Sequence, residues 1–184
     1  MIPAMMTAIG VVREREIGSI SNLYASPAST SQYLIGKQMP YVVVGMVNFA
    51  ALVLMMIFWF GVPVKGSFAA LALGTLLIVL ASTALGLLIS TFVKSQLAAI
   101  FVAALGTMIP TVNYSGFMYP LSTITGAGHV VGQIFPASWY MNVSIGGFTK
   151  GLGVADLALE YAAMTVFALV CMTASCLLLK KQEP

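Results

Sequence analysis

The sequence predicts an all-α polytopic membrane protein with four transmembrane helices, a short amphipathic helix ahead of them and short re-entrant helices. Of its 184 residues, 60% are apolar and 7% are charged, against about 45–50% and 25% in an ordinary soluble domain. The charges are also widely spaced, with 27 uncharged residues between Lys37 and Lys65, 28 between Lys65 and Lys94, and 19 between Glu160 and Lys180. A helix crosses the roughly 30 Å hydrocarbon layer with about 20 apolar residues. Each of these stretches therefore predicts one span.

Residues 1–12 are apolar but too short to cross a bilayer. No basic stretch precedes them, so they do not match a cleavable signal peptide. We interpret them as the end of a preceding helix whose beginning is missing, or as a stub, with a short surface anchor as the alternative.

Residues 13–37 form the one extended polar stretch of the sequence. It opens with the mixed-charge run from Arg13 to Glu16, after which Ile17, Ile20 and Leu23 recur at helical spacing. One apolar stripe beside polar residues is typical of an amphipathic helix. We therefore expect a short amphipathic helix here.

A break and a second helix follow. Ser26 precedes Pro27 and is disfavoured in the α region, which ends the amphipathic helix. Ser29 and Gln32 have the spacing of a capping box. This box predicts the start of a helix that leads into the first span.

The four spans are predicted at about residues 39–60, 67–92, 97–118 and 157–179. Pro40 falls in the first turn of the first span, where a missing N–H costs least, and Pro110 predicts a kink in the third. Small side chains let helices approach closely in lipid. The second span carries five of them: Gly74, Ser82, Thr83, Gly86 and Ser90.

Residues 119–153 are partly apolar but interrupted by glycine and proline, so no window is long enough for an ordinary span. Short helices that enter the membrane and turn back, or that lie at its surface, fit this pattern. Trp139 and Tyr140 suit a position at the membrane interface.

The basic residues predict the orientation. Four spans place both ends of the chain on one side of the membrane. One side then holds six basic residues and the other holds Lys65 and Lys150; the six are Arg13, Arg15, Lys37, Lys94, Lys180 and Lys181. The positive-inside rule makes the richer side cytoplasmic.

Several kinds of chemistry are not expected. The sequence has no G-x-x-x-x-G-K-[ST] phosphate loop, and His129, its one histidine, does not suggest a metal centre. The basic residues are isolated, so the net charge of +3 does not indicate a nucleic-acid partner. Asp156 and Glu160 are interpreted as a solvated helix start. We expect no cofactor.

Five motifs in order resemble type-2 ABC transporter permeases, the closest likeness being to bacterial inner-membrane permeases of the putative multidrug-export type. The run REREIGSISNLYASPASTSQYLIGKQMPY resembles their coupling segment. FGVPVKGS, GLLISTFVKSQ and YSGFMYP resemble later turns, and IFPASWYMNVSIGGFTKG resembles their outer re-entrant segment. That segment commonly has an arginine where this chain has Gly146. A full permease of this type resembles a six-span protein, so the chain is similar to its C-terminal transmembrane portion.

The resemblance implies a permease component of an ATP-driven exporter in the bacterial inner membrane. Its partners would be an ABC ATPase subunit or domain, which hydrolyses ATP, a second permease chain and the lipid bilayer. The cytoplasmic coupling helix would use seven residues: Glu16, Gly18, Ser19, Ile20, Leu23, Ser26 and Pro27. The outer gate would use Pro136, Trp139 and Tyr140.

Two other functions remain open at this stage. One is a membrane scaffold without transport activity, or a truncated permease product. The other is a membrane-embedded enzyme that uses Asp156 and Glu160, for which the sequence offers no nucleophile and base.

Overall fold

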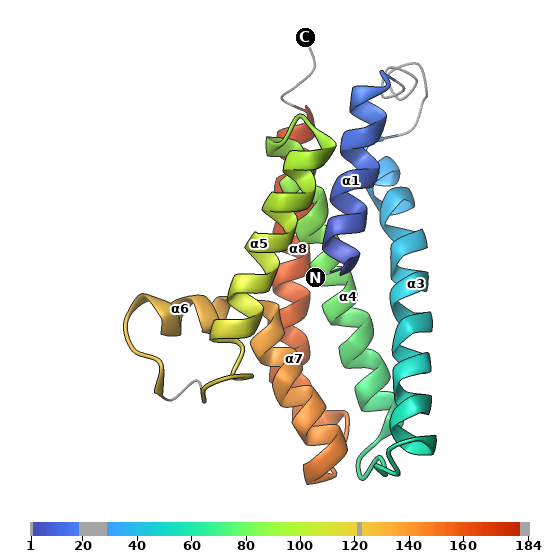
Figure 1. Ribbon diagram of the computed structural model, residues 1–184, viewed down its shortest axis with the longest axis vertical. Coiled ribbons are helices and arrows are strands. Elements are labelled where there is room, and N and C mark those ends of the chain that lie inside the picture. Colours follow the sequence, from blue (N-terminus) through green and yellow to red (C-terminus); the bar gives the residue numbers. More distant parts are fainter. Residues whose placement is uncertain (1, 19–28, 121–122, 181–184) are drawn as a thin grey trace. The chain divides into compact units, whose positions relative to one another are not determined.

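A computed structural model of the chain describes residues 2–18, 29–120 and 123–180 (Figure 1). Its α-helices are α1 (Ile2–Glu16), α3 (Thr30–Phe58), α4 (Phe68–Phe92), α5 (Gln96–Tyr114), α6 (Ala127–Ile134), α7 (Pro136–Ile145) and α8 (Ala158–Lys180). A π-helical turn, η2 (Gly146–Lys150), follows α7, and a 3₁₀ turn, η3 (Ala155–Leu157), precedes α8. None of the described residues forms a β-strand, which confirms the all-α class.

The described residues include four helices that are long and apolar enough to cross a membrane: Thr30–Phe58, Phe68–Phe92, Gln96–Tyr114 and Ala155–Leu179. They confirm the four predicted spans. The third ends at Tyr114 instead of residue 118, because the chain turns after it and Gly116 adopts a φ of 86°. Pro110 lies inside α5, as predicted.

The helix that contains the first span begins at the predicted capping box. Ser29 N donates to Gln32 Oε1 over 3.0 Å, and Gln32 N donates to Ser29 Oγ over 3.4 Å, so the predicted capping box is confirmed. The helix that starts there continues without interruption to Phe58. The placement of Pro40 in a first turn was therefore wrong, since the proline lies inside α3 and removes one helical hydrogen bond.

The chain divides into two compact units, unit 1 (residues 1–43, 80–108 and 168–184) and unit 2 (residues 44–79 and 109–167). The helix α1 belongs to unit 1, and α6 and α7 belong to unit 2. The long helices α3, α4, α5 and α8 contribute residues to both.

In unit 1, α1 packs against the parts of four helices that belong to the same unit. Its buried residues form two apolar clusters, one with the α4–α5 turn and α5, and one with α3, α4 and α8. The first contains Ala8, Val12, Val93, Ala99 and Ala103, and the second contains Val11, Leu34, Leu87 and Leu179. A short surface anchor would not be enclosed in this way, so that alternative was wrong.

α1 and α4 approach each other closely at Gly86. A Cβ atom at this position would lie 2.2 Å from the carbonyl oxygen of Ala4 and 2.5 Å from Oγ1 of Thr7. Only a residue without a side chain allows the two backbones to come so near. The predicted role of the small residues of the second span is confirmed here.

A buried amide also joins α3 to α4 within unit 1. Gln38 is 5% exposed, and its Nε2 donates to the carbonyl oxygen of Leu80 over 2.9 Å and to Oγ1 of Thr83 over 2.7 Å. Interhelical bonds of this kind support helix association in lipid. No motif in the sequence singles out Gln38.

Unit 2 has its own core, to which α3, α4, α7, η3 and α8 contribute. Its buried residues are Phe49, Val53, Ala70, Leu71, Val143, Leu157, Tyr161 and Met164. Tyr161 OH donates to the carbonyl oxygen of Ala70 over 3.0 Å. A Cβ at Gly74 would lie 2.5 Å from Cγ1 of Val143, so this glycine lets α7 approach α4.

The turn that precedes α4 is joined to η2 by backbone hydrogen bonds. Gly66 N donates to the carbonyl oxygen of Gly147 over 2.8 Å, and Ser67 N donates to that of Leu152 over 3.4 Å. The N–H groups of Gly151 and Leu152 both bond to the carbonyl of Gly146, as in a π-turn. Because both of these N–H groups bond to Gly146, the carbonyl of Gly147 is available to accept the bond from Gly66 N.

We predict that Gly86→Ala lowers the free energy of unfolding by about 1–3 kcal/mol, because the added methyl group meets the α1 backbone. Thermal unfolding of the detergent-purified protein measures the change. Gly106→Ala in α5 is the matched control, since a Cβ there meets nothing within 4 Å. It should be neutral or stabilising by up to about 1 kcal/mol. Equal effects of the two variants would refute the close approach at Gly86.

Candidate functional site

The polar stretch of residues 13–37 is described at its two ends. The mixed-charge run from Arg13 to Glu16 completes α1. Ile17 follows as an exposed turn residue. Five of the predicted coupling residues lie outside the described residues, namely Ser19, Ile20, Leu23, Ser26 and Pro27. The amphipathic helix therefore stays a prediction.

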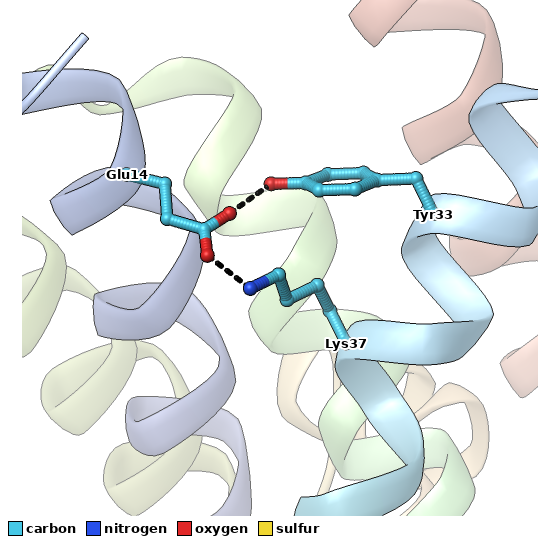
Figure 2. Close-up of polar contacts among 3 residues, drawn as sticks. All are labelled: Glu14, Tyr33 and Lys37. Atoms are coloured by element: carbon cyan, nitrogen blue, oxygen red, sulfur yellow. Dashed lines mark hydrogen bonds and ion pairs between the residues drawn. The ribbon is translucent and has the colours of Figure 1, made fainter. Parts of the chain in front are cut away.

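A polar cluster joins the two ends of this stretch (Figure 2). We call Glu14, Tyr33 and Lys37 the flank cluster. Tyr33 OH donates to Glu14 Oε2 over 2.6 Å, and Lys37 Nζ forms an ion pair with Glu14 Oε1. Tyr33 and Lys37 are four residues apart on α3, which places both side chains on the face that meets α1. The cluster thus ties the end of α1 to the first turns of α3.

The flank cluster also sets the ionisation of Glu14. Burial by itself raises the pKa of this carboxyl group, but the hydrogen bonds from Lys37 and Tyr33 and the charge of Lys37 outweigh it. The pKa of Glu14 is therefore lowered from its ordinary value of 4.5. The carboxylate is charged at neutral pH, as an ion pair with Lys37 requires.

Glu16, a predicted coupling residue, contacts the start of α5. Gln96 donates to its carboxylate twice, from the backbone N over 2.9 Å and from Nε2. The side-chain bond and then the backbone bond from Gln96 lower the pKa of Glu16. The side chain therefore caps α5, where a negative charge also suits the helix dipole.

Gly18, another predicted coupling residue, follows the end of α1. Ile17 N bonds to the carbonyl of Arg13 over 3.0 Å and Gly18 N to that of Arg15 over 3.2 Å. Gly18 has a φ of 76°, a left-handed conformation that commonly ends helices and that favours glycine. Its local role is to turn the chain out of α1.

These contacts fix both flanks of the predicted coupling segment. Glu14 holds the first flank to α3, Glu16 holds it to α5, and the Ser29–Gln32 capping box starts the helix at the second flank. The described residues on either side of the segment are thus held to α1, α3 and α5. No catalytic group is needed for this arrangement.

The predicted gate residues lie on α7 in unit 2. Pro136 is buried at the first position of α7, where its missing N–H costs little. Trp139 Nε1 donates to the carbonyl oxygen of Gln133 over 2.8 Å, and Tyr140 OH lies 3.0 Å from Oγ1 of Thr75 on α4. The structure brings these three residues onto one short helix and joins that helix to α6 and α4.

Gly146 occupies the position at which the resemblance to type-2 ABC permeases implies an arginine. It is buried, and a Cβ there would lie 3.1 Å from Cδ1 of Leu152 and 3.3 Å from Cδ2 of Leu157. An arginine would have to displace both leucines. The absence of a charge at this position thus agrees with the packing around it.

Asp156 and Glu160 line a pocket of about 220 Å³ in unit 2 together with Lys150 and Asn142. Asp156 Oδ2 accepts a bond from Gly153 N over 2.8 Å, as a carboxylate does at a helix start. His129 lines a separate pocket of about 170 Å³. Among the described residues, no three His, Cys, Asp or Glu side chains are grouped as metal ligands.

Sequence reasoning missed the pairing of Glu14 with Tyr33 and Lys37. The partners lie 19 and 23 residues apart on separate helices. No short motif joins them. A signal was present only in the opposite charges of Glu14 and Lys37 at the two ends of one polar stretch.

We predict that Glu14→Gln lowers the free energy of unfolding by about 1–2 kcal/mol at pH 7, because it removes a charge-assisted bond in a partly exposed pair. A double-mutant cycle with Lys37→Met, measured by thermal unfolding, should show coupling between the two residues. Additive effects would contradict the ion pair.

The same variant gives a pH test. A carboxyl group with a lowered pKa stabilises the fold above its ordinary value of 4.5, and this contribution is lost as the pH falls through the lowered pKa. The stability difference between wild type and Glu14→Gln should therefore shrink with acidification. A difference that grows with acidification would oppose the assignment.

Comparison with known proteins places the chain in a family. The family described as ABC-2 family transporter protein matches residues 1–177. The probable multidrug ABC transporter permease YbhS of Escherichia coli is 30% identical over 82% of this chain and 40% of that protein. The probable multidrug ABC transporter permease YbhR of the same organism is 28% identical over 93% of this chain and 45% of that protein.

A eukaryotic relative, ABC transporter G family member 20 of Dictyostelium discoideum, is 29% identical over 81% of this chain and 20% of that protein. No solved structure shows a significant match. The chain thus spans less than half the length of these curated relatives. The match to the family covers nearly all of the chain, and the chain belongs to the ABC-2 family of transporter proteins.

Proposed function

We propose that this chain is the transmembrane permease part of an ATP-driven exporter in the bacterial inner membrane, with both ends in the cytoplasm. The flank cluster carries the proposal, because it links the two ends of the predicted coupling segment to the membrane-spanning helices. The ABC-2 family membership and the bacterial permeases among the relatives support it.

In this proposal an ABC ATPase docks on residues 17–26 from the cytoplasm. Ile17, 67% exposed at the end of α1, begins the apolar stripe that would enter a groove on the ATPase. Closure of two ATPases around ATP would displace the segment. Through Glu14 and Glu16 that displacement reaches α3 and α5, and it opens a substrate path between two permease chains.

The outer segment has the role of exit gate in the same proposal. Trp139 and Tyr140 hold α7 to α6 and α4 through single hydrogen bonds, which a rearrangement can break and remake. Export of drugs is the proposed activity, by analogy with the relatives named as probable multidrug permeases.

The ATPase contact is tested by co-purification. The protein is solubilised in detergent with the ATPase encoded beside it or fused to it. The Ile20→Asp/Leu23→Asp variant should lose at least nine-tenths of the ATPase, roughly the effect of removing two apolar anchors. Val154→Asp, at an exposed apolar position of unit 2, is the control and should keep it. Full retention of the ATPase by the Ile20→Asp/Leu23→Asp variant would refute the proposed docking on residues 17–26.

The scaffold alternative gives a different result in the same preparation. A scaffold can retain the ATPase, but export of a fluorescent dye would not depend on it. Dye export that stops with an ATPase unable to hydrolyse ATP supports the permease. Unchanged export, or none in any condition, favours the scaffold.

The gate is tested by Tyr140→Phe, which removes one hydroxyl group and keeps the ring. Loss of its bond to Thr75 destabilises the closed outer segment by about 1 kcal/mol. We expect a severalfold change in dye export with unchanged ATPase retention. Thr75→Val should change dye export by the same factor. The double variant Tyr140→Phe/Thr75→Val should show no larger change than either single variant. Independent, additive effects would argue against a shared bond.

A further inference from the structure

A basic pocket in unit 1 shares Glu16 with the proposed coupling but contains two cations that the coupling does not use. It has a volume of about 590 Å³ and lies where α1 ends and α4 turns into α5. Its lining consists of Arg15, Glu16, Thr91, Phe92 and Lys94. We call it the α1–α4 pocket. It combines two cations with a large apolar side chain.

The guanidinium of Arg15 has donors to spare. Its Nη1 donates to the carbonyl oxygen of Ser90 over 3.1 Å, which fixes the orientation of the group. Its Nη2 is buried and has no hydrogen-bond partner among the described residues. A buried donor without a partner is unfavourable. A small rotation of the guanidinium toward the adjoining pocket would let Nη2 donate a hydrogen bond to an anion bound there.

The other charges around the pocket leave it basic. Among the described residues, neither Arg15 nor Lys94 forms an ion pair with a carboxylate. The carboxylate of Glu16 is occupied, since Gln96 donates to both of its oxygens. The lining therefore carries two positive charges against one engaged negative charge. A fork of guanidinium donors beside an ammonium group suits a phosphate.

The apolar side of the pocket indicates where the phosphate comes from. Phe92 is 70% exposed and Leu97, near the start of α5, is 71% exposed. Both belong to helices that are apolar enough to cross a membrane. Phe92 lines the pocket together with the two cations, and Leu97 is the second residue of α5. A free anion makes no favourable contact with the apolar surface of Phe92, whereas the acyl chains of a lipid can pack against it.

We propose that the α1–α4 pocket binds the phosphate of an anionic phospholipid. Arg15 and Lys94 hold the phosphate, and Phe92 contacts the adjoining acyl chain. The site is separate from the predicted ATPase contact, and it stands whether or not the ATPase docks on residues 17–26.

The test is a titration of the detergent-purified full-length protein with phosphatidylglycerol, followed by native mass spectrometry. Lys94→Gln and Arg15→Gln should each weaken phosphatidylglycerol binding about fivefold, the effect of one cation near a membrane surface. Arg13→Gln is the matched control: it removes the same charge from an exposed residue of α1 outside the pocket. It should change binding less than twofold.

Two further arms separate the sources of the anion. Zwitterionic phosphatidylethanolamine should bind more weakly than phosphatidylglycerol, and inorganic phosphate in large excess should not displace the bound lipid. Equal binding of the two lipids, displacement by inorganic phosphate, or equal losses for Arg13→Gln and Lys94→Gln would each overturn the proposal. Lys94 is exposed, so its variant decides the question even where Arg15→Gln does not fold.

Discussion

The absence of water from the bilayer is the constraint on which the rest of the structure depends. In hydrocarbon, every backbone donor and acceptor needs a partner within the protein, so the spans must be helices. The hydrophobic effect then contributes little to bringing these helices together, because lipid tails are as apolar as leucine. Close contact and buried polar bonds have to supply the association. Gly86 and Gly74 provide the contact and Gln38 provides the bonds.

The same constraint explains where the charges lie. Ionisable side chains are costly inside hydrocarbon, and they gather at helix ends. The end of α1 bears Glu14, Arg15 and Glu16, which reach α3, α4 and α5 respectively. A single turn of helix thereby connects three neighbours. This concentration of polar contacts beside the predicted coupling segment suits a part of the protein that passes movement from one helix to several others.

The class of the protein could be predicted from the sequence because long uncharged stretches have few structural alternatives. The four spans and the Ser29–Gln32 capping box depend on local composition and spacing, and the structure confirms them. Pairings across the chain could not be predicted in this way. Nothing near Glu14 in the sequence specifies Tyr33 and Lys37, and nothing near Gln38 specifies Thr83. The position of Pro40 was mistaken because proline resembles a start signal, whereas the preceding cap had already begun the helix.

The bond from Gly66 to Gly147 has a mechanical consequence for the outer segment. The π-turn η2 contains one more residue than an α-helical turn. The carbonyl of Gly147 is therefore not used within the turn, and it accepts the hydrogen bond from Gly66 N. The turn before α4 and the turn that follows α7 are therefore joined through main-chain atoms, at two glycines where an added Cβ would clash with neighbouring atoms. Separating the two turns leaves the N–H of Gly66 and the carbonyl of Gly147 without a partner. Both groups then need hydrogen bonds from water, because an unpaired backbone group is costly where water is excluded. Breaking this backbone hydrogen bond therefore costs less free energy where water reaches it than where it is shielded from water.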